Sequence, residues 1–155
     1  MAIDKVKNYL KKFNLDDKIL EFETSSATVE LASQALNCEP ERIAKTMSFM
    51  VNDKPILIVL AGNIKIDNSK YKREFHTKAK MIPFNEVENI IGHAPGGVCP
   101  FGINENIDVY LDESLKKYKT VFPACGSSNS AIELNITQLE ETSKYIKWIN
   151  VGKEI

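Results

Sequence analysis

Cysteine and glycine are scarce in this chain, which has three cysteines and seven glycines among 155 residues. Cys38, Cys99 and Cys125 are an odd number and form no Cys-x-x-Cys pair, so we expect free thiols rather than disulfides or a zinc site. The longest apolar run, 56–61, is too short to span a bilayer. The N-terminus lacks the apolar segment of a signal peptide. Together these absences predict a cytoplasmic protein without a metal.

An excess of charge of one sign is also missing. Twenty basic and 21 acidic side chains leave a net charge of −1. Any contact with a nucleic acid must therefore come from a local basic patch. The hydrophobic share of 43% and the charged share of 26% are ordinary for a globular protein. The length predicts one domain over residues 1–155 with a single core.

Backbone punctuation is concentrated in one segment, 92–102, which holds four of the seven glycines and two of the six prolines. Proline fixes φ, and glycine permits positive φ and close backbone approach. Such a loop can hold its N–H groups in fixed directions, toward an oxyanion or a ligand carbonyl. A purely structural turn is the alternative interpretation.

Helical and strand patterns alternate along the chain. Helical spacing predicts an amphipathic helix near 3–13, a second near 28–36, a third from Asp67 or Ser69 to Phe75, a fourth over 83–91 that ends at Gly92, and a last one from Thr137 with a capping-box order. Strands are predicted near 20–22, 46–51, 56–61, 107–111, 120–124, 131–134 and 145–149. This intermixing predicts a mixed α/β (α+β) fold.

Hydroxyl and lysine side chains lie close to these predicted elements. Thr24, Ser26 and Thr28 precede the second helix, where a hydroxyl either caps the helix or faces a ligand. Lys45 lies where a short turn enters a core strand. Its ammonium group either reaches water or requires an anionic or polar ligand, because burial disfavours its charge.

A basic segment extends from Gly62 to Lys80, with six lysines or arginines against Asp67 and Glu74. It is the best candidate for phosphate contacts, although a solvated helix face would have the same composition. His76 is expected at its surface. Two further open alternatives are Cys99, either a packed residue or a nucleophile with His93 as base, and Asp112, either a helix cap or a support for the loop.

The order of four features is distinctive: 43–46 (Ile-Ala-Lys-Thr), the basic segment, the loop 92–102, and Gly126-Ser127. In this order they resemble the YbaK/prolyl-tRNA-synthetase-associated editing domain, over about residues 24–139. The resemblance implies a barrel-like mixed β-sheet surrounded by helices. It also implies a free-standing hydrolase that cleaves the ester of mischarged tRNA without a metal, a cofactor or a covalent intermediate.

Site residues follow from the same resemblance. Lys45 corresponds to the family's pocket lysine, the loop to the segment that holds the aminoacyl carbonyl, and Gly126-Ser127 to a small-residue loop of the pocket. We predict that Lys45, Gly96 and Gly97 are catalytic. We predict that the substrate is bound by Thr24, Ser26, Thr46, Gly92, His93, Ala94, Pro95, Val98, Cys99, Pro100, Gly126 and Ser127, and the tRNA backbone by Lys70, Lys72, Arg73 and Lys78.

The implied activity is an aminoacyl-tRNA deacylase acting in trans, on tRNA(Pro)-type substrates that carry cysteine, alanine or a similar small amino acid. A synthetase is an implied partner. Such editing is needed because one methylene gives a synthetase only about 1–3 kcal/mol of discrimination. Two alternatives stay open: a non-catalytic module that binds aminoacyl-tRNA or a synthetase, and a hydrolase of another small acyl ester.

Overall fold

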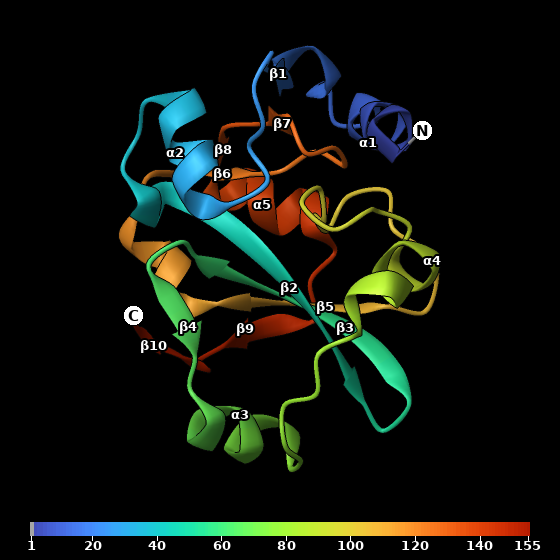
Figure 1. The fold of residues 1–155 in the computed structure, drawn as a ribbon, viewed down its shortest axis with the longest axis vertical. Coiled ribbons are helices and arrows are strands. Elements are labelled where there is room, and N and C mark those ends of the chain that lie inside the picture. Colours follow the sequence, from blue (N-terminus) through green and yellow to red (C-terminus); the bar gives the residue numbers. More distant parts are fainter. Residues whose placement is uncertain (1) are drawn as a thin grey trace.

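A six-stranded mixed sheet forms the centre of the computed structural model, which describes residues 2–155 (Figure 1). The strand order is β8-β6-β2-β3-β5-β9. The β2–β3 and β6–β8 pairs are antiparallel, and the β2–β6, β3–β5 and β5–β9 pairs are parallel. The bounds are β2 (Ile43–Val51), β3 (Lys54–Ala61), β5 (Asp108–Asp112), β6 (Thr120–Pro123), β8 (Leu134–Asn135) and β9 (Lys147–Ile149). The sheet curls into a half-barrel, so the predicted mixed, barrel-like architecture is confirmed.

The hairpin β2–β3 is the longest pairing in the sheet, with register from Ala44 opposite Ala61 to Val51 opposite Lys54. Asn52 and Asp53 connect the strands with φ of 49° and 67°. Positive φ at both turn residues gives a twist that matches the flanking strands. From Ile56 to Ala61, β3 is buried on both faces, as its continuous apolar sequence predicts.

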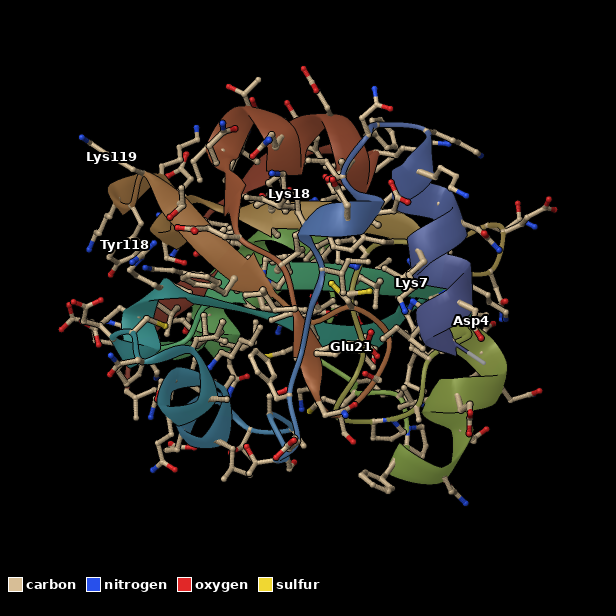
Figure 2. The ribbon with its side chains drawn as sticks, turned by 90° about the horizontal axis from the view of Figure 1, so that it is seen from above. Asp4, Lys7, Lys18, Glu21, Tyr118 and Lys119 are labelled. Atoms are coloured by element: carbon tan, nitrogen blue, oxygen red, sulfur yellow. The ribbon has the colours of Figure 1, made fainter. Side chains whose placement is uncertain are left out.

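Five α-helices pack around this sheet. They are α1 (Ala2–Lys11), α2 (Val29–Leu36), α3 (Asn68–Phe75), α4 (Val87–Ile91) and α5 (Ile136–Ser143). Helix α3 covers one face of the sheet: the rings of Tyr71 and Phe49 are 5.3 Å apart, and Tyr71 is fully buried. Figure 2 shows α1 beside β1 (Leu20–Glu21), where Lys7 Nζ lies 3.1 Å from Glu21 Oε2.

Smaller elements complete the fold. β1 pairs with β7 (Ser130–Ala131), and β4 (Ile64–Ile66) pairs with β10 (Gly152–Glu154), both antiparallel. The 3₁₀ helices are η1 (Asp16–Lys18), η2 (Pro40–Arg42), η3 (Phe84–Glu86) and η4 (Glu113–Lys117). Within residues 2–155, no helix is long and apolar enough to cross a membrane.

Several sequence expectations are refined by these bounds. The predicted strand at 131–134 is split into β7 and β8, which belong to different sheets. The capping box of α5 is formed by Asn135 with Gln138, so the helix begins before the predicted start at Thr137. The Asn135 side-chain oxygen reaches the Gln138 N–H at 2.7 Å and satisfies one of the free donors of the first turn. Asp112 is a cap rather than a support for the loop: it accepts hydrogen bonds from the N–H groups of Ser114 and Val151.

Candidate functional site

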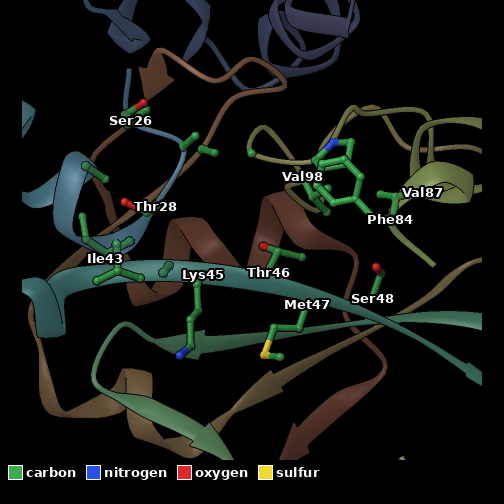
Figure 3. A pocket seen from close by; sticks show the side chains of 18 of the residues that line it. Ser26, Thr28, Ile43, Lys45, Thr46, Met47, Ser48, Phe84, Val87 and Val98 are labelled. Atoms are coloured by element: carbon green, nitrogen blue, oxygen red, sulfur yellow. The ribbon is translucent and has the colours of Figure 1, made fainter. Parts of the chain in front are cut away.

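The main cavity, of about 650 Å³, opens between α2, strand β2, the loop 92–102 and the segment 81–87 (Figure 3). Its lining residues come from several separate parts of the chain. They are Ser26, Ala27, Thr28, Val29, Ala32, Ile43, Ala44, Lys45, Thr46, Met47, Ser48, Met81, Ile82, Pro83, Phe84, Val87, Pro95, Gly96, Val98, Phe122, Ala124, Ser130 and Ala131.

One edge of β2 is interrupted where it borders this cavity. Ile43 and Ala44 pair with β6, and Phe49 forms a bridge with Met81 on the same edge. Residues 45–47 have no ladder partner on that edge among residues 2–155. The Ser48 carbonyl accepts a hydrogen bond from the Ile82 N–H, and the Met50 N–H donates to the Lys80 carbonyl. Since N–H and C=O directions alternate along an antiparallel strand, the backbone groups of Thr46 also point to this edge.

The side chain of Thr46 points into the cavity, toward Val98 and Phe84 (Figure 3). Its Oγ1 is buried and has no hydrogen-bond partner in the described part of the chain. A buried hydroxyl without a partner costs about 1–3 kcal/mol of stability. The cavity therefore contains an unused hydrogen-bonding group that a ligand oxygen or nitrogen could satisfy.

Lys45, the preceding residue, leaves β2 on the opposite face, together with Met47 (Figure 3). This alternation is the ordinary period of a β-strand. The side chain is partly buried, and its burial lowers the pKa of the ammonium group, while the Glu30 carboxylate partly offsets that shift. The lysine thus lies beside the cavity with a charge that its surroundings do not fully stabilise.

The loop 92–102 begins at Gly92, whose φ of 103° ends α4, as the sequence predicts. Pro95, Gly96 and Val98 reach the cavity. The N–H groups of Gly96 and Val98 have no hydrogen-bond acceptor among residues 2–155. By contrast, the Gly97 N–H donates to the Ala94 carbonyl at 3.0 Å and closes a turn.

Gly97 is held against the loop 126–130 rather than toward the cavity. Its carbonyl accepts a hydrogen bond from the Gly126 N–H at 3.0 Å. A Cβ at position 97 would lie 2.6 Å from the Ser127 nitrogen. The absence of a side chain at this residue therefore allows the two loops to touch, and we assign Gly97 to packing between the loops rather than to the binding of an oxyanion.

The loop 126–130 also connects to the segment before α2. The Ser128 carbonyl accepts from the Ser26 N–H at 2.6 Å, and the Asn129 carbonyl accepts from the Phe22 N–H. Ser127 Oγ donates to Ser130 Oγ at 2.7 Å, and Ser130 lines the cavity. Gly126 and Ser127, two predicted substrate ligands, therefore lie behind the wall and fix the positions of residues that form it.

Both hydroxyls before α2 have defined roles. Thr28 Oγ1 accepts a hydrogen bond from the Leu31 N–H at 3.2 Å and is the helix cap. Ser26 is buried, donates to the Ser128 carbonyl and borders the cavity. Thr24, also predicted to bind substrate, is exposed and does not line the cavity.

His93 and Cys99 are buried side by side behind the loop. The Cys99 Sγ lies 3.5 Å from His93 Nε2, which donates to the Phe101 carbonyl at 2.7 Å. Burial raises the pKa of the Cys99 thiol to about 12 and lowers the pKa of His93. A thiol kept protonated and away from the cavity is not an activated nucleophile, so the packed interpretation holds.

The remaining predicted residues also differ in position. Gly92, Ala94 and Pro100 do not border the main cavity, and Pro100 lies on a second cavity of about 260 Å³. Within residues 2–155, no group of three or more His, Cys, Asp or Glu side chains is placed to hold a metal ion.

The predicted tRNA contacts lie on and after α3. Lys70 Nζ donates to the Gly152 carbonyl at 2.7 Å and thereby ties α3 to β10. Lys72, Arg73 and Lys78 are exposed, and none of them forms an ion pair with a described residue. Of the four, Lys70 has a structural contact of its own, and the other three are free to meet a phosphate.

Sequence reasoning missed much of the apolar wall. Ala32, Ile43 and Phe122 form a small cluster with Val29, separate from the main core. Phe84 was not predicted either. It precedes the buried Val87 by three residues, so helical spacing alone would place both side chains on one buried face. No signal in the sequence distinguishes the buried residue from the exposed one.

Comparison with known proteins gives the same family as the motifs. The sequence model of the aminoacyl-tRNA editing domain matches residues 23–142. The chain therefore belongs to the aminoacyl-tRNA editing domain family.

Three relatives illustrate the range of similarity. "Uncharacterized protein YwhH" of Bacillus subtilis is 49% identical over 155 residues, 99% of each chain. "Putative Cys-tRNA(Pro)/Cys-tRNA(Cys) deacylase EbsC" of Enterococcus faecalis is 28% identical over 69% of this chain and 66% of its own length. The crystal structure of a putative trans-editing enzyme for prolyl tRNA synthetase superposes with a TM-score of 0.88 and 25% identity, covering 98% of this chain and 97% of that one.

Proposed function

We propose that this protein is a trans-acting deacylase that hydrolyses the ester of mischarged tRNA. The observation that carries the proposal is the unpartnered Thr46 hydroxyl at the interrupted edge of β2, which faces the loop 92–102 across the cavity. Membership of the editing family supports the reaction class, and the names of EbsC and the crystallised relative support action in trans.

Hydrolysis of an aminoacyl ester needs little beyond water and a stabilised oxyanion, since the ester is already activated. In our proposal the ester carbonyl lies between the Thr46 hydroxyl and the Gly96 N–H. Removing one donor of an oxyanion typically costs about 10²–10³ in rate. These donors and water are sufficient, so the proposed reaction uses no metal and no covalent intermediate.

Lys45 has a different role from Thr46, because the two side chains lie on opposite faces of β2. We assign Lys45 to a phosphate or ribose hydroxyl of the acceptor end rather than to the carbonyl. Its partial burial and lowered pKa support an anionic ligand, which would stabilise the charged form.

The amino acid in the proposed substrate is small and uncharged. Val29, Ala32, Ile43 and Phe122 form an apolar wall that offers no partner for a charged side chain. Cysteine and alanine fit this chemistry, and the name of EbsC supports cysteine on tRNA(Pro)-type substrates. A synthetase partner and a cytoplasmic location are part of the same proposal.

The first experiment is deacylation of a panel of mischarged tRNAs by the purified protein, with Lys45→Ala as the control variant. Rapid loss of one or a few small amino acids, absent in the variant, supports the proposal. Saturable binding of aminoacyl-tRNA without hydrolysis would replace it by the binding-module alternative. Equal hydrolysis of simple acyl esters, insensitive to salt, would indicate a small-ester hydrolase instead.

A further inference from the structure

Phe84 occupies an unusual position at the mouth of the main cavity. It is 79% exposed, and it borders the cavity beside Val98 and Val87 (Figure 3). Full burial of a phenylalanine side chain is worth about 1.5–3 kcal/mol, so an exposed ring forgoes that stabilisation. Met81, on the same segment, is 55% exposed.

The backbone beneath the ring is nonetheless firmly attached. The Ile82 N–H donates to the Ser48 carbonyl, and the Glu86 N–H donates to the Pro83 carbonyl. Val87, one helical turn after Phe84, is buried. The ring is therefore presented to solvent by an ordered segment, and its exposure does not follow from a loose chain.

Among the described residues that line the cavity, one other is aromatic. Phe122 is only 8% exposed, and the Arg42 guanidinium lies over its ring at 4.9 Å. Its π face is already covered. Phe84 thus offers the single open aromatic face beside this cavity within residues 2–155.

We propose that Phe84, with Met81 beside it, is a stacking platform for the adenine base of the acceptor end's terminal nucleotide. The inference rests on the proposed function. The scissile ester is carried by the ribose of that nucleotide, so when the ester is in the cavity the attached base must lie at its mouth. Aromatic side chains bind unpaired bases through stacking, worth about 1–3 kcal/mol per base.

Charge next to the platform favours a nucleic acid over an apolar protein segment. Lys78 and Lys80 precede the ring and are exposed. Glu86 and Glu88 follow it and are exposed as well. A phosphate chain leaving the base would therefore run over the lysine side, away from α4, because like charges repel it there.

Binding of a CCA trinucleotide tests this without requiring hydrolysis. Titration calorimetry on the full chain would compare CCA with the same trinucleotide whose 3′ sugar lacks its base. The variants are Phe84→Ala and Phe84→Trp. Ile146→Ala is the matched control, because Ile146 is 55% exposed and does not line the cavity. The melting temperature of each variant verifies folding.

We expect Phe84→Ala to weaken CCA binding by roughly 5- to 100-fold, the range that corresponds to the loss of one stacked base. Phe84→Trp and Ile146→Ala should bind like the wild type, and the abasic trinucleotide should bind wild type and Phe84→Ala equally weakly. Unchanged binding in Phe84→Ala, equal binding of the two trinucleotides, or no binding of CCA to the wild type would overturn the platform. Failure of the proposed function is separate: it would appear as CCA binding without deacylation of any mischarged tRNA.

Discussion

Lys45 and Thr46 are adjacent in the sequence, yet their side chains leave β2 on opposite faces of the sheet (Figure 3). Thr46 points toward the loop 92–102, and Lys45 lies on the face that α3 covers farther along the strand, where Phe49 packs against Tyr71. The Lys-Thr pair is therefore two separate binding groups at one cavity, and each can be removed without the other.

The Thr46→Val substitution removes the unpartnered hydroxyl while keeping the side-chain shape. We expect the free energy of unfolding to stay the same or rise, because the substitution removes a buried hydroxyl that has no partner. Deacylation should slow by about 10²-fold if that hydroxyl binds the oxyanion. Single-turnover rates and thermal unfolding would be measured together. A variant as fast as the wild type would remove Thr46 from the site.

Lys45→Met separates stability from activity in the same way. Burial lowers the pKa of this lysine, so the folded state disfavours its charge, and a neutral side chain of similar length should not destabilise the protein. The Michaelis constant for mischarged tRNA should rise about tenfold or more, as expected for the removal of a charged hydrogen bond of about 1.5–3 kcal/mol. Lys65→Met, on an exposed position of β4, is the matched control. Normal kinetics for Lys45→Met would contradict the assignment.

Gly97→Ala tests the packing between the two loops. The new Cβ would lie 2.6 Å from the Ser127 nitrogen and 2.7 Å from the Gly126 carbonyl carbon, so the backbone has to move. We expect a decrease of about 1–3 kcal/mol in unfolding free energy, typical of overpacking, together with slower deacylation. Chemical denaturation measures the first. Ser128→Ala, at an exposed position of the opposing loop, should leave stability unchanged. A fully stable Gly97→Ala would show that the loops are not constrained.

Charge reversal at Lys72 and Arg73 tests the tRNA surface. Both are exposed and have no ion-pair partner among residues 2–155, so the substitutions to glutamate should not affect folding. The Michaelis constant for tRNA should rise more than the rate at saturation falls. The slope of log binding constant against log salt should also become shallower by about 1 for each lysine or arginine that no longer meets a phosphate. If both quantities match the wild type, this surface is simply solvated.

Stability should decrease in mild acid because of His93. Burial lowers the pKa of its imidazole below the ordinary value, so between the folded and unfolded pKa values the unfolded chain binds the additional proton. The contribution of His93 is complete above about pH 6.5 and disappears as the pH falls through the folded pKa. Melting temperatures from about pH 7.5 to about pH 5 would show this decrease. It should persist in His76→Asn, at the exposed histidine, and be reduced in His93→Gln.

Much of the fold could be predicted because local patterns agreed with the tertiary structure. The apolar run 56–61 is the buried strand β3, and Tyr71 and Phe75 share a face of α3 with ring centroids 4.7 Å apart. Gly92 ends α4 where predicted. The pattern failed at 131–134, because two short strands that join different sheets have no periodicity long enough to separate them.

For the candidate site, the sequence determined the chemistry that is present: a lysine and threonine on a strand, a glycine- and proline-rich loop, and a small polar loop. Only the tertiary structure decided which of these groups meet. The order of residues in the loop 92–102 does not reveal that Gly96 reaches the cavity while the Gly97 N–H is used by Ala94. Nor does it reveal that His93 and Cys99 are buried behind the wall, or that Phe84 stays exposed at the mouth. Composition and spacing fix the available groups, whereas their directions depend on packing between segments that are distant in the chain.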